Sequence, residues 1–209
     1  MNKLLLLFFI AFAGFSFDGN SQPSSSELEQ VQAINASEFL NSIGVCSSIT
    51  GRGETLQGTI DALKYTGIRF IRCGLEDGIS TENMIELHRE TGAKIVYGLL
   101  SGGTDIERLI REARELAEAG ALLAIEGNNE PNNWGVTYGG EKGGENYSWL
   151  PVAKLQRDLY KAVKNDPVLK NIPVWNISES GAQTDNVGLQ FLTIPEDAGT
   201  LMPAGTQYA

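Results

Sequence analysis

From about residue 39 onward, short apolar runs alternate with longer segments that have helical periodicity. The run IGVCSSI begins at Ile43, and in the segment after it Leu56, Ile60 and Leu63 recur at helical spacing before Gly67. A short apolar run followed by an amphipathic segment that ends at glycine is typical of a strand and the helix after it. The pattern therefore predicts a β-α unit.

The same unit recurs along the chain. A helix is expected from Thr81 to Gly92, and a further helix is predicted with Thr104 and Glu107 as its capping box and Gly120 after its end. A Gly-rich connection then precedes a helix that starts near Pro151. Four more strands are predicted from apolar runs at 68–75, 94–100, 121–129 and 172–178.

The order of these elements predicts the fold class. Apolar strands separated by single helices are typical of a parallel sheet with helices outside it, which makes the class α/β. We expect the N-terminal portion of a (β/α)8, TIM-barrel-like fold, with about five parallel strands and outer helices. A small, complete, doubly wound α/β domain is the alternative at this stage.

Composition and charge narrow the function classes. The 209 residues carry a formal net charge of -10, and no run of Lys or Arg forms a basic stripe, so nucleic acid is not an expected partner. The segment after the first strand, SSITGRGETLQG, lacks the dinucleotide-binding glycine pattern, and no P-loop motif occurs. No His, Cys and Asp residues have metal-ligand spacing. The sequence thus predicts neither a cofactor nor a metal.

Polar residues gather where the predicted strands end. Ser47 and Ser48 follow the first strand, Arg72 closes the second, the segment 126–130 ends the fourth, and 176–179 ends the fifth. In (β/α)8 barrels the carboxyl ends of the strands form the face that carries active sites. We therefore expect a functional site at this edge of the sheet.

The motif Asn129-Glu130-Pro131, led by Glu126-Gly127-Asn128 at the end of a fourth strand, resembles the large clan of retaining glycoside hydrolases with (β/α)8 barrels. The resemblance implies that Glu130 is the general acid/base, that Asn129 hydrogen-bonds the sugar 2-hydroxyl, and that Arg72 supports the nucleophile electrostatically. It covers roughly residues 39–180. Cleavage of a glycoside needs one carboxylic acid to protonate the leaving oxygen and a second carboxylate on the other side. A carbohydrate substrate is therefore the expected partner.

Other polar and aromatic residues have two interpretations each. Glu126 has the same strand parity as Glu130, and a structural ion pair with Arg72 is favoured over a catalytic role. Trp134 could stack on a sugar face or belong to the core. Glu179, at the end of the fifth strand, is interpreted as a substrate-contact or structural residue.

The N-terminus has the pattern of an export signal. Lys3 precedes an apolar run from Leu4 to Phe15, which is too short to span a bilayer, so residues 1–21 are interpreted as a signal peptide. Residues 22–38 are interpreted as a polar tether and 39–209 as the partial barrel domain. The mature protein is expected to be secreted or periplasmic and to have no stable membrane anchor after cleavage. In that setting Cys46 and Cys73 could pair, although two small buried thiols on neighbouring strands are favoured.

The chain ends at Ala209, where a sixth strand is expected. A full barrel has about 250 residues, so we expect an incomplete chain that lacks the nucleophile of the seventh strand and is inactive alone. An open sheet edge would favour self-association. The rival hypothesis is a secreted, non-catalytic carbohydrate-binding or interaction module built on a partial barrel.

Overall fold

A computed structural model describes residues 33–76, 78–145 and 147–179 of the chain. These residues belong almost entirely to one compact unit that begins at Asn35. Its first element is a short helix, α1 (Ala36–Leu40), whose N-cap Asn35 accepts a hydrogen bond from the Ser37 amide at 2.8 Å. The interpreted signal peptide lies outside the described residues, and α1 starts within the segment interpreted as a tether.

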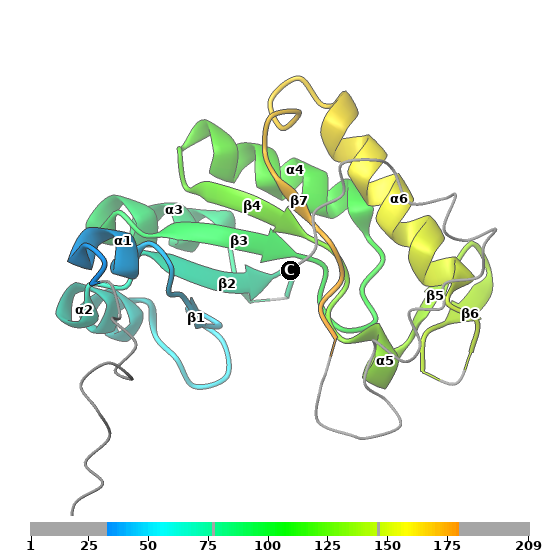
Figure 1. Cartoon of the computed structure of the whole chain (residues 1–209), viewed down its shortest axis with the longest axis horizontal. Helices are drawn as coiled ribbons and strands as arrows, with labels where there is room; N and C mark the ends of the chain where they lie inside the picture. The colour runs from blue at the N-terminus through cyan, green and yellow to red at the C-terminus, as the bar shows by residue number, and fades with distance from the viewer. Residues whose placement is uncertain (1–32, 77, 146, 180–209) are drawn as a thin grey trace, which may run out of the picture. The chain divides into compact units, whose positions relative to one another are not determined.

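The centre of the unit is one parallel sheet of five strands (Figure 1). Each strand pairs with the strand that follows it in the βα series, and the register shifts once, between Ile95 and Val96. In spatial order the strands are β1 (Val45–Cys46), β2 (Phe70–Gly74), β3 (Lys94–Gly98), β4 (Leu122–Glu126) and β7 (Val174–Trp175).

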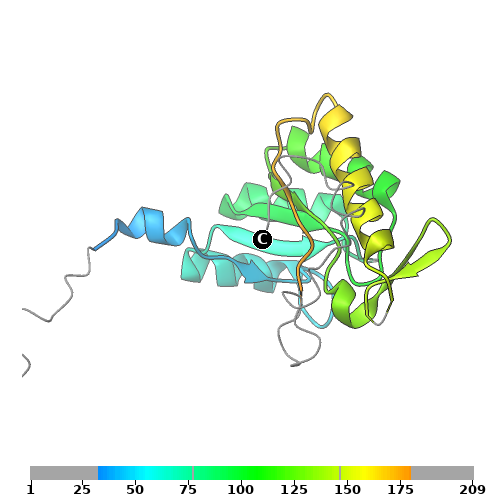
Figure 2. The same ribbon diagram turned by 45° about the vertical axis from the view of Figure 1, so that its right-hand side comes forward.

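The helices between the strands form one layer. They pack against one another in chain order, α2 on α3, α3 on α4 and α4 on α6. Figures 1 and 2 both show α4 and α6 side by side. Sequential strand order with neighbouring helices in contact is the arrangement of a (β/α) barrel, whereas a doubly wound sheet reverses its strand order and splits its helices between two faces. The expected α/β class and partial-barrel arrangement are confirmed, and the doubly wound alternative is wrong.

The helix bounds follow the glycine and cap signals, with two corrections at N-termini. Helix α2 (Leu56–Thr66) and helix α3 (Thr81–Thr91) each end at a glycine in the left-handed conformation. The N-cap of α3 is Ser80, and Thr81 is its first helical residue. The predicted Thr104–Glu107 capping box of α4 (Ile106–Glu118) is wrong, because the Asp105 carboxylate accepts from the Arg108 amide at 2.9 Å and so caps the helix one residue later.

The Gly-rich connection after β4 has structure that the pattern did not predict. It begins with a single helical turn, α5 (Pro131–Trp134), and continues as an antiparallel hairpin of β5 (Val136–Tyr138) and β6 (Glu141–Gly143). The hairpin packs on α6 (Leu150–Asn165) and in Figure 2 projects to the right, next to α5. This insertion therefore lies beyond the carboxyl ends of the strands.

The hydrophobic core lies between the sheet and the helices. Side chains at alternate strand positions, such as Ile71, Ile95 and Ile125, are completely buried against apolar helix residues such as Leu87 and Leu159. Burial of this continuous apolar layer is the main favourable term in folding. It fixes the strands in space and so places their polar carboxyl ends together.

The two cysteines are free thiols in this structure. Cys46 pairs in register with Arg72, so Cys46 and Cys73 point to opposite faces of the sheet. The favoured interpretation of unpaired thiols agrees with this arrangement, but Cys46 is exposed and not buried. Burial raises the pKa of the Cys73 thiol to about 12. Within the described part of the chain, no helix is both long and apolar enough to cross a membrane.

Candidate functional site

A cleft of about 630 Å³ lies at the carboxyl edge of the sheet, within the size range of small-molecule sites. It is lined by residues from the ends of β1, β2, β3 and β4 and from α5. Four of the five residues expected from the sequence to form a site line it together, namely Arg72, Asn129, Glu130 and Trp134.

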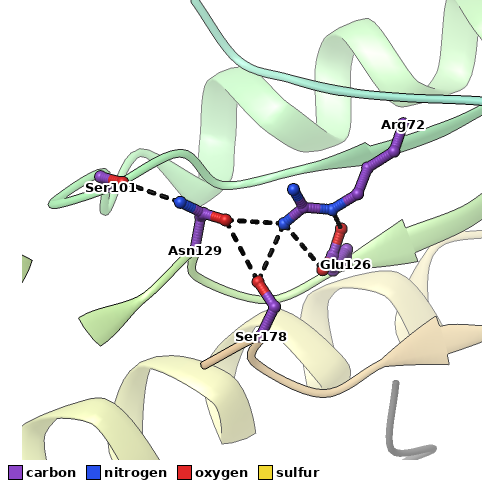
Figure 3. A network of polar contacts seen from close by, with 5 residues as sticks. All are labelled: Arg72, Ser101, Glu126, Asn129 and Ser178. Carbon is purple, nitrogen blue, oxygen red and sulfur yellow. Dashed lines mark hydrogen bonds and ion pairs between the residues drawn. The ribbon is translucent and has the colours of Figure 1, made fainter. Parts of the chain in front are cut away.

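Arg72 lines the cleft and is the centre of a network of polar contacts, which Figure 3 shows. Its Nε donates to Glu126 at 2.6 Å, and its Nη2 donates to the other carboxylate oxygen at 3.0 Å. The same Nη2 lies 2.8 Å from Asn129 Oδ1 and 2.8 Å from Ser178 Oγ. The guanidinium thus joins residues from β2, β4 and the segment after β7.

The Arg72–Glu126 ion pair predicted from strand parity is present. The Glu126 side chain is only 4% exposed, so its charge requires a fixed partner. The hydrogen bond to Glu126 raises the pKa of Arg72 despite partial burial. Gly98 makes room for this pair, because a Cβ there would lie 2.8 Å from both the Cβ and the backbone oxygen of Glu126.

Asn129 is held from both sides. Its Oδ1 accepts from Arg72 and Ser178, while its Nδ2 donates to Ser101 Oγ at 2.9 Å (Figure 3). Its backbone forms a parallel bridge with Ser178 and donates to the Leu99 carbonyl at 3.1 Å. The amide orientation is therefore set by the network, with nitrogen away from Arg72, and one of its two N–H hydrogens is used by Ser101.

Glu130 follows in an uncommon backbone conformation. Its φ of 49° and ψ of 51° lie in the left-handed region, which costs an L-residue roughly 1–2 kcal/mol. Its amide donates to the Ser178 carbonyl at 2.7 Å, and its own carbonyl accepts from Asn133 and Trp134, which hold it in this conformation. Strained residues that the surrounding structure over-determines cluster at functional sites. Glu130 is half-buried and lines the cleft.

Trp134 forms part of the cleft wall and not of the core. The residue is 63% exposed, and its Nε1 donates to Glu130 Oε2 at 3.3 Å. An exposed indole that is fixed by a hydrogen bond offers a flat apolar surface next to a carboxyl group. Of the two interpretations, the core role is wrong, because α5 turns this side chain outward.

Glu179, the fifth expected residue, does not line the cleft. It is half-buried, its Oε1 has no hydrogen-bond partner among the described residues, and burial raises the pKa of its carboxyl. Ser178, the residue before it, is the one that reaches the network. Strand β7 ends at Trp175, so Glu179 lies four residues beyond the regular strand.

The loop after β1 forms a second part of the cleft, of which the sequence predicted Ser47 and Ser48 but not the charged residues Arg52, Glu54 and Glu76. Ser47 Oγ donates to Glu54 at 2.5 Å, and the Glu54 carboxylate also accepts from the Ile49 amide at 3.1 Å. The hydrogen bond from Ser47 lowers the pKa of Glu54. Next to it, Arg52 pairs with Glu76 at 3.2 Å. In the sequence, Arg52, Glu54 and Glu76 appear only as isolated polar residues. The contact between Arg52 after β1 and Glu76 after β2 forms only in the folded protein.

In the described ranges, no group of three or more His, Cys, Asp or Glu side chains is arranged to hold a metal ion. The side chains that line the cleft carry carboxyl, amide, hydroxyl, thiol and guanidinium groups beside an aromatic wall. Such a set can transfer a proton, hydrogen-bond hydroxyl groups and stack on a ring.

No family model and no curated protein matches this chain. Among solved structures, phospho-2-dehydro-3-deoxyheptonate aldolase (DAHP synthase) from Thermotoga maritima is similar at a TM-score of 0.40 and 16% identity. The match covers 79% of this chain and 40% of that structure, so it spans less than half of that structure's length.

Proposed function

We propose that the cleft is the acid/base half of a retaining glycoside hydrolase site, with Glu130 as the general acid and base. The observation that carries the proposal is Glu130 itself, a carboxyl group fixed in a strained conformation at the carboxyl end of a barrel-type strand, between an oriented amide and an exposed indole. Strain of this kind is retained where it positions a reacting group.

The proposed mechanism assigns a role to each neighbour. Glu130 protonates the glycosidic oxygen as the bond to the anomeric carbon breaks, and it later removes a proton from the attacking water. Asn129 donates its second N–H hydrogen to the sugar 2-hydroxyl, because Arg72 and Ser178 occupy its oxygen. Trp134 supports the sugar ring. Glu126 is neutralised by Arg72 and so serves as a structural partner of the network.

The nucleophile is not assigned to a described residue. By the resemblance to the clan it belongs to a seventh strand, and the described sheet has five. The proposal thus concerns half of a two-carboxylate reaction, in a secreted or periplasmic protein whose substrate is a carbohydrate.

The test uses protein of natural length purified from its natural host, assayed on a panel of aryl and natural glycosides. We expect hydrolysis with retained anomeric configuration, followed by NMR. Glu130→Gln should slow hydrolysis of natural glycosides by about 10²- to 10⁴-fold, because a general acid is lost. Dinitrophenyl glycosides should be slowed less in the bond-breaking step, since their leaving group needs no proton.

The matched control is Glu118→Gln, which neutralises an exposed carboxylate at the end of α4 and should leave turnover unchanged. Unchanged turnover in Glu130→Gln would refute the assigned role. Sugar binding with no hydrolysis, at an affinity that Glu130→Gln leaves unaltered, would favour the non-catalytic carbohydrate-binding module instead.

A further inference from the structure

A second hollow, of about 420 Å³, lies next to the cleft and shares Trp134 with it. Trp134 lines both hollows, and the second one, here called the aromatic groove, is otherwise formed by the β5–β6 hairpin and the loop after β3. Its side chains include Trp134, Tyr147, Lys142, Glu145 and Thr104. Neither Asn129 nor Glu130 lines it, so the groove is an extension of the site and not part of its proposed chemistry.

Two large aromatic side chains in the groove are exposed to solvent. Tyr147 is 48% exposed and Trp134 is 63% exposed, although both could gain free energy by burial. The Lys142 ammonium lies 5.3 Å from the centroid of the Tyr147 ring and so helps to fix it. Exposed aromatic groups next to polar ones are typical of a surface that is covered by a ligand.

The groove is attached rigidly to the strand end that carries Glu130. The Glu145 amide donates to the Pro131 carbonyl at 2.8 Å, and the Tyr147 amide donates to the Gly144 carbonyl at 2.8 Å. Gly144 has φ of +76°, and a Cβ there would lie 2.1 Å from the Pro131 oxygen, so only glycine permits this close approach. The segment after β6 is therefore fixed to α5, and it holds Tyr147 at a set position relative to Glu130.

The charges of the two hollows indicate what kind of sugar fits. The cleft has four carboxyl groups and two guanidinium groups among its lining residues, and the groove adds one carboxylate and one ammonium. An acidic polysaccharide would be repelled by this balance, whereas neutral hydroxyl groups find both donors and acceptors.

We infer that the aromatic groove binds further sugar units of a neutral, linear oligosaccharide longer than a disaccharide, whose other end lies in the cleft. This inference rests on the proposed function. The apolar faces of successive pyranose rings would pack on Trp134 and Tyr147, while Lys142 and Glu145 hydrogen-bond their hydroxyl groups. The substrate assigned to the site is therefore a polymer or a long oligomer, bound at an interior position, and not a small glycoside.

Isothermal titration calorimetry of the full chain with neutral glucose, xylose and mannose oligomers of about two to six units tests this inference. For one series, affinity should rise about tenfold or more between the dimer and the pentamer. Tyr147→Ala should remove this gain, weakening pentamer binding about tenfold and dimer binding less than about twofold. Galacturonate oligomers should not bind.

Tyr147→Trp, which keeps an aromatic surface, should retain the length dependence, and Tyr65→Ala, which removes a 92% exposed tyrosine on α2, should change nothing. Three results would each overturn the inference that the groove binds sugar units. They are an affinity that does not depend on oligomer length, a length dependence that persists in Tyr147→Ala, and no binding of any oligomer. If hydrolysis depends on Glu130 while Tyr147→Ala has no effect on the affinity for the oligomers, only the inference about the groove is refuted. If no glycoside is hydrolysed, but affinity rises with oligomer length and Tyr147→Ala removes this rise, the groove is supported as a sugar-binding site and the proposed hydrolysis is refuted.

Discussion

At the scale of single residues, the main feature of this protein is the contrast between Glu130 and its neighbours. Arg72, Glu126 and Asn129 satisfy one another through hydrogen bonds. Glu130 instead has a strained backbone, and its carboxylate contacts Trp134 at 3.3 Å. The residues that stabilise the network are therefore adjacent to Glu130, the residue proposed to react, but distinct from it.

The strain at Glu130 can be measured by comparing Glu130→Gly with Glu130→Ala. Both variants remove the carboxyl group and its contact with Trp134, but only glycine adopts a φ of 49° at no steric cost. We expect the glycine variant to be more stable than the alanine variant by about 1 kcal/mol in urea denaturation. Equal stabilities would show that the backbone conformation is not strained.

Sequence reasoning reached most of the site at this scale. Strand parity predicted the contact between Arg72 and Glu126, because residues at alternate positions of successive parallel strands face the same side of the sheet, here across the intervening strand β3. Glu179, interpreted as a substrate-contact or structural residue at the end of the fifth strand, does not line the cleft, and Ser178 contacts Arg72 instead. The left-handed conformation of Glu130 has no sequence signature, because one of the hydrogen bonds that hold it joins its amide to Ser178, which is distant in sequence.

At the scale of elements, the end of helix α6 shows how a buried charge fixes a turn. The Asp166 side chain is 1% exposed, and its carboxylate accepts from the amides of Val168 and Leu169 and from Arg114 of α4. Burial opposes ionisation, but these donors outweigh it and lower the pKa of Asp166 below its usual 3.8. The charge thereby joins α4 to the turn that leads into β7.

Because the pKa of Asp166 is lower in the folded than in the unfolded protein, its stabilising contribution is complete above pH 3.8 and is lost as the pH falls through the folded value. Asp166→Asn should therefore lower the free energy of unfolding by about 2 kcal/mol near pH 7. The difference between variant and wild type should shrink as the pH falls below 3.8. Urea denaturation across this range measures it, and a difference that stays constant would contradict the assignment.

The regular helices and strands were predictable because their signals are local. Gly67 and Gly92 end helices through the left-handed conformation that glycine favours. The β5–β6 hairpin was not predicted, since its short strands have little apolar alternation and depend on packing against α6. The sequence of the Gly-rich stretch therefore predicts a loop, whereas the stretch folds as a hairpin.

At the scale of the whole molecule, the described sheet has two edges, β1 and β7. In the part of the chain that the structure describes, β1 pairs only with β2, and Val45 is 36% exposed. Unpaired strand edges offer backbone donors and acceptors to another chain. We expect this edge to cause the self-association predicted from the sequence.

Sedimentation velocity at increasing protein concentration tests this expectation. Wild type should form larger species as concentration rises, and Val45→Lys should weaken the association by about tenfold, because a charge at the edge opposes strand addition. Val168→Lys, at a 38% exposed valine after α6, is the control and should behave like wild type. Identical monomeric sedimentation of all three proteins would refute the expectation.

The sequence by itself determined the class of the fold, the order of its βα units and the strand end where polar residues gather, because periodicity and helix stops are properties of neighbouring residues. The tertiary structure decided which of those residues meet. The pairing of Asn129 with Ser178, the conformation of Glu130, the ion pair of Arg52 with Glu76 and the aromatic groove all depend on contacts between distant segments. Such contacts follow from strand register and packing of the core, which no local pattern specifies.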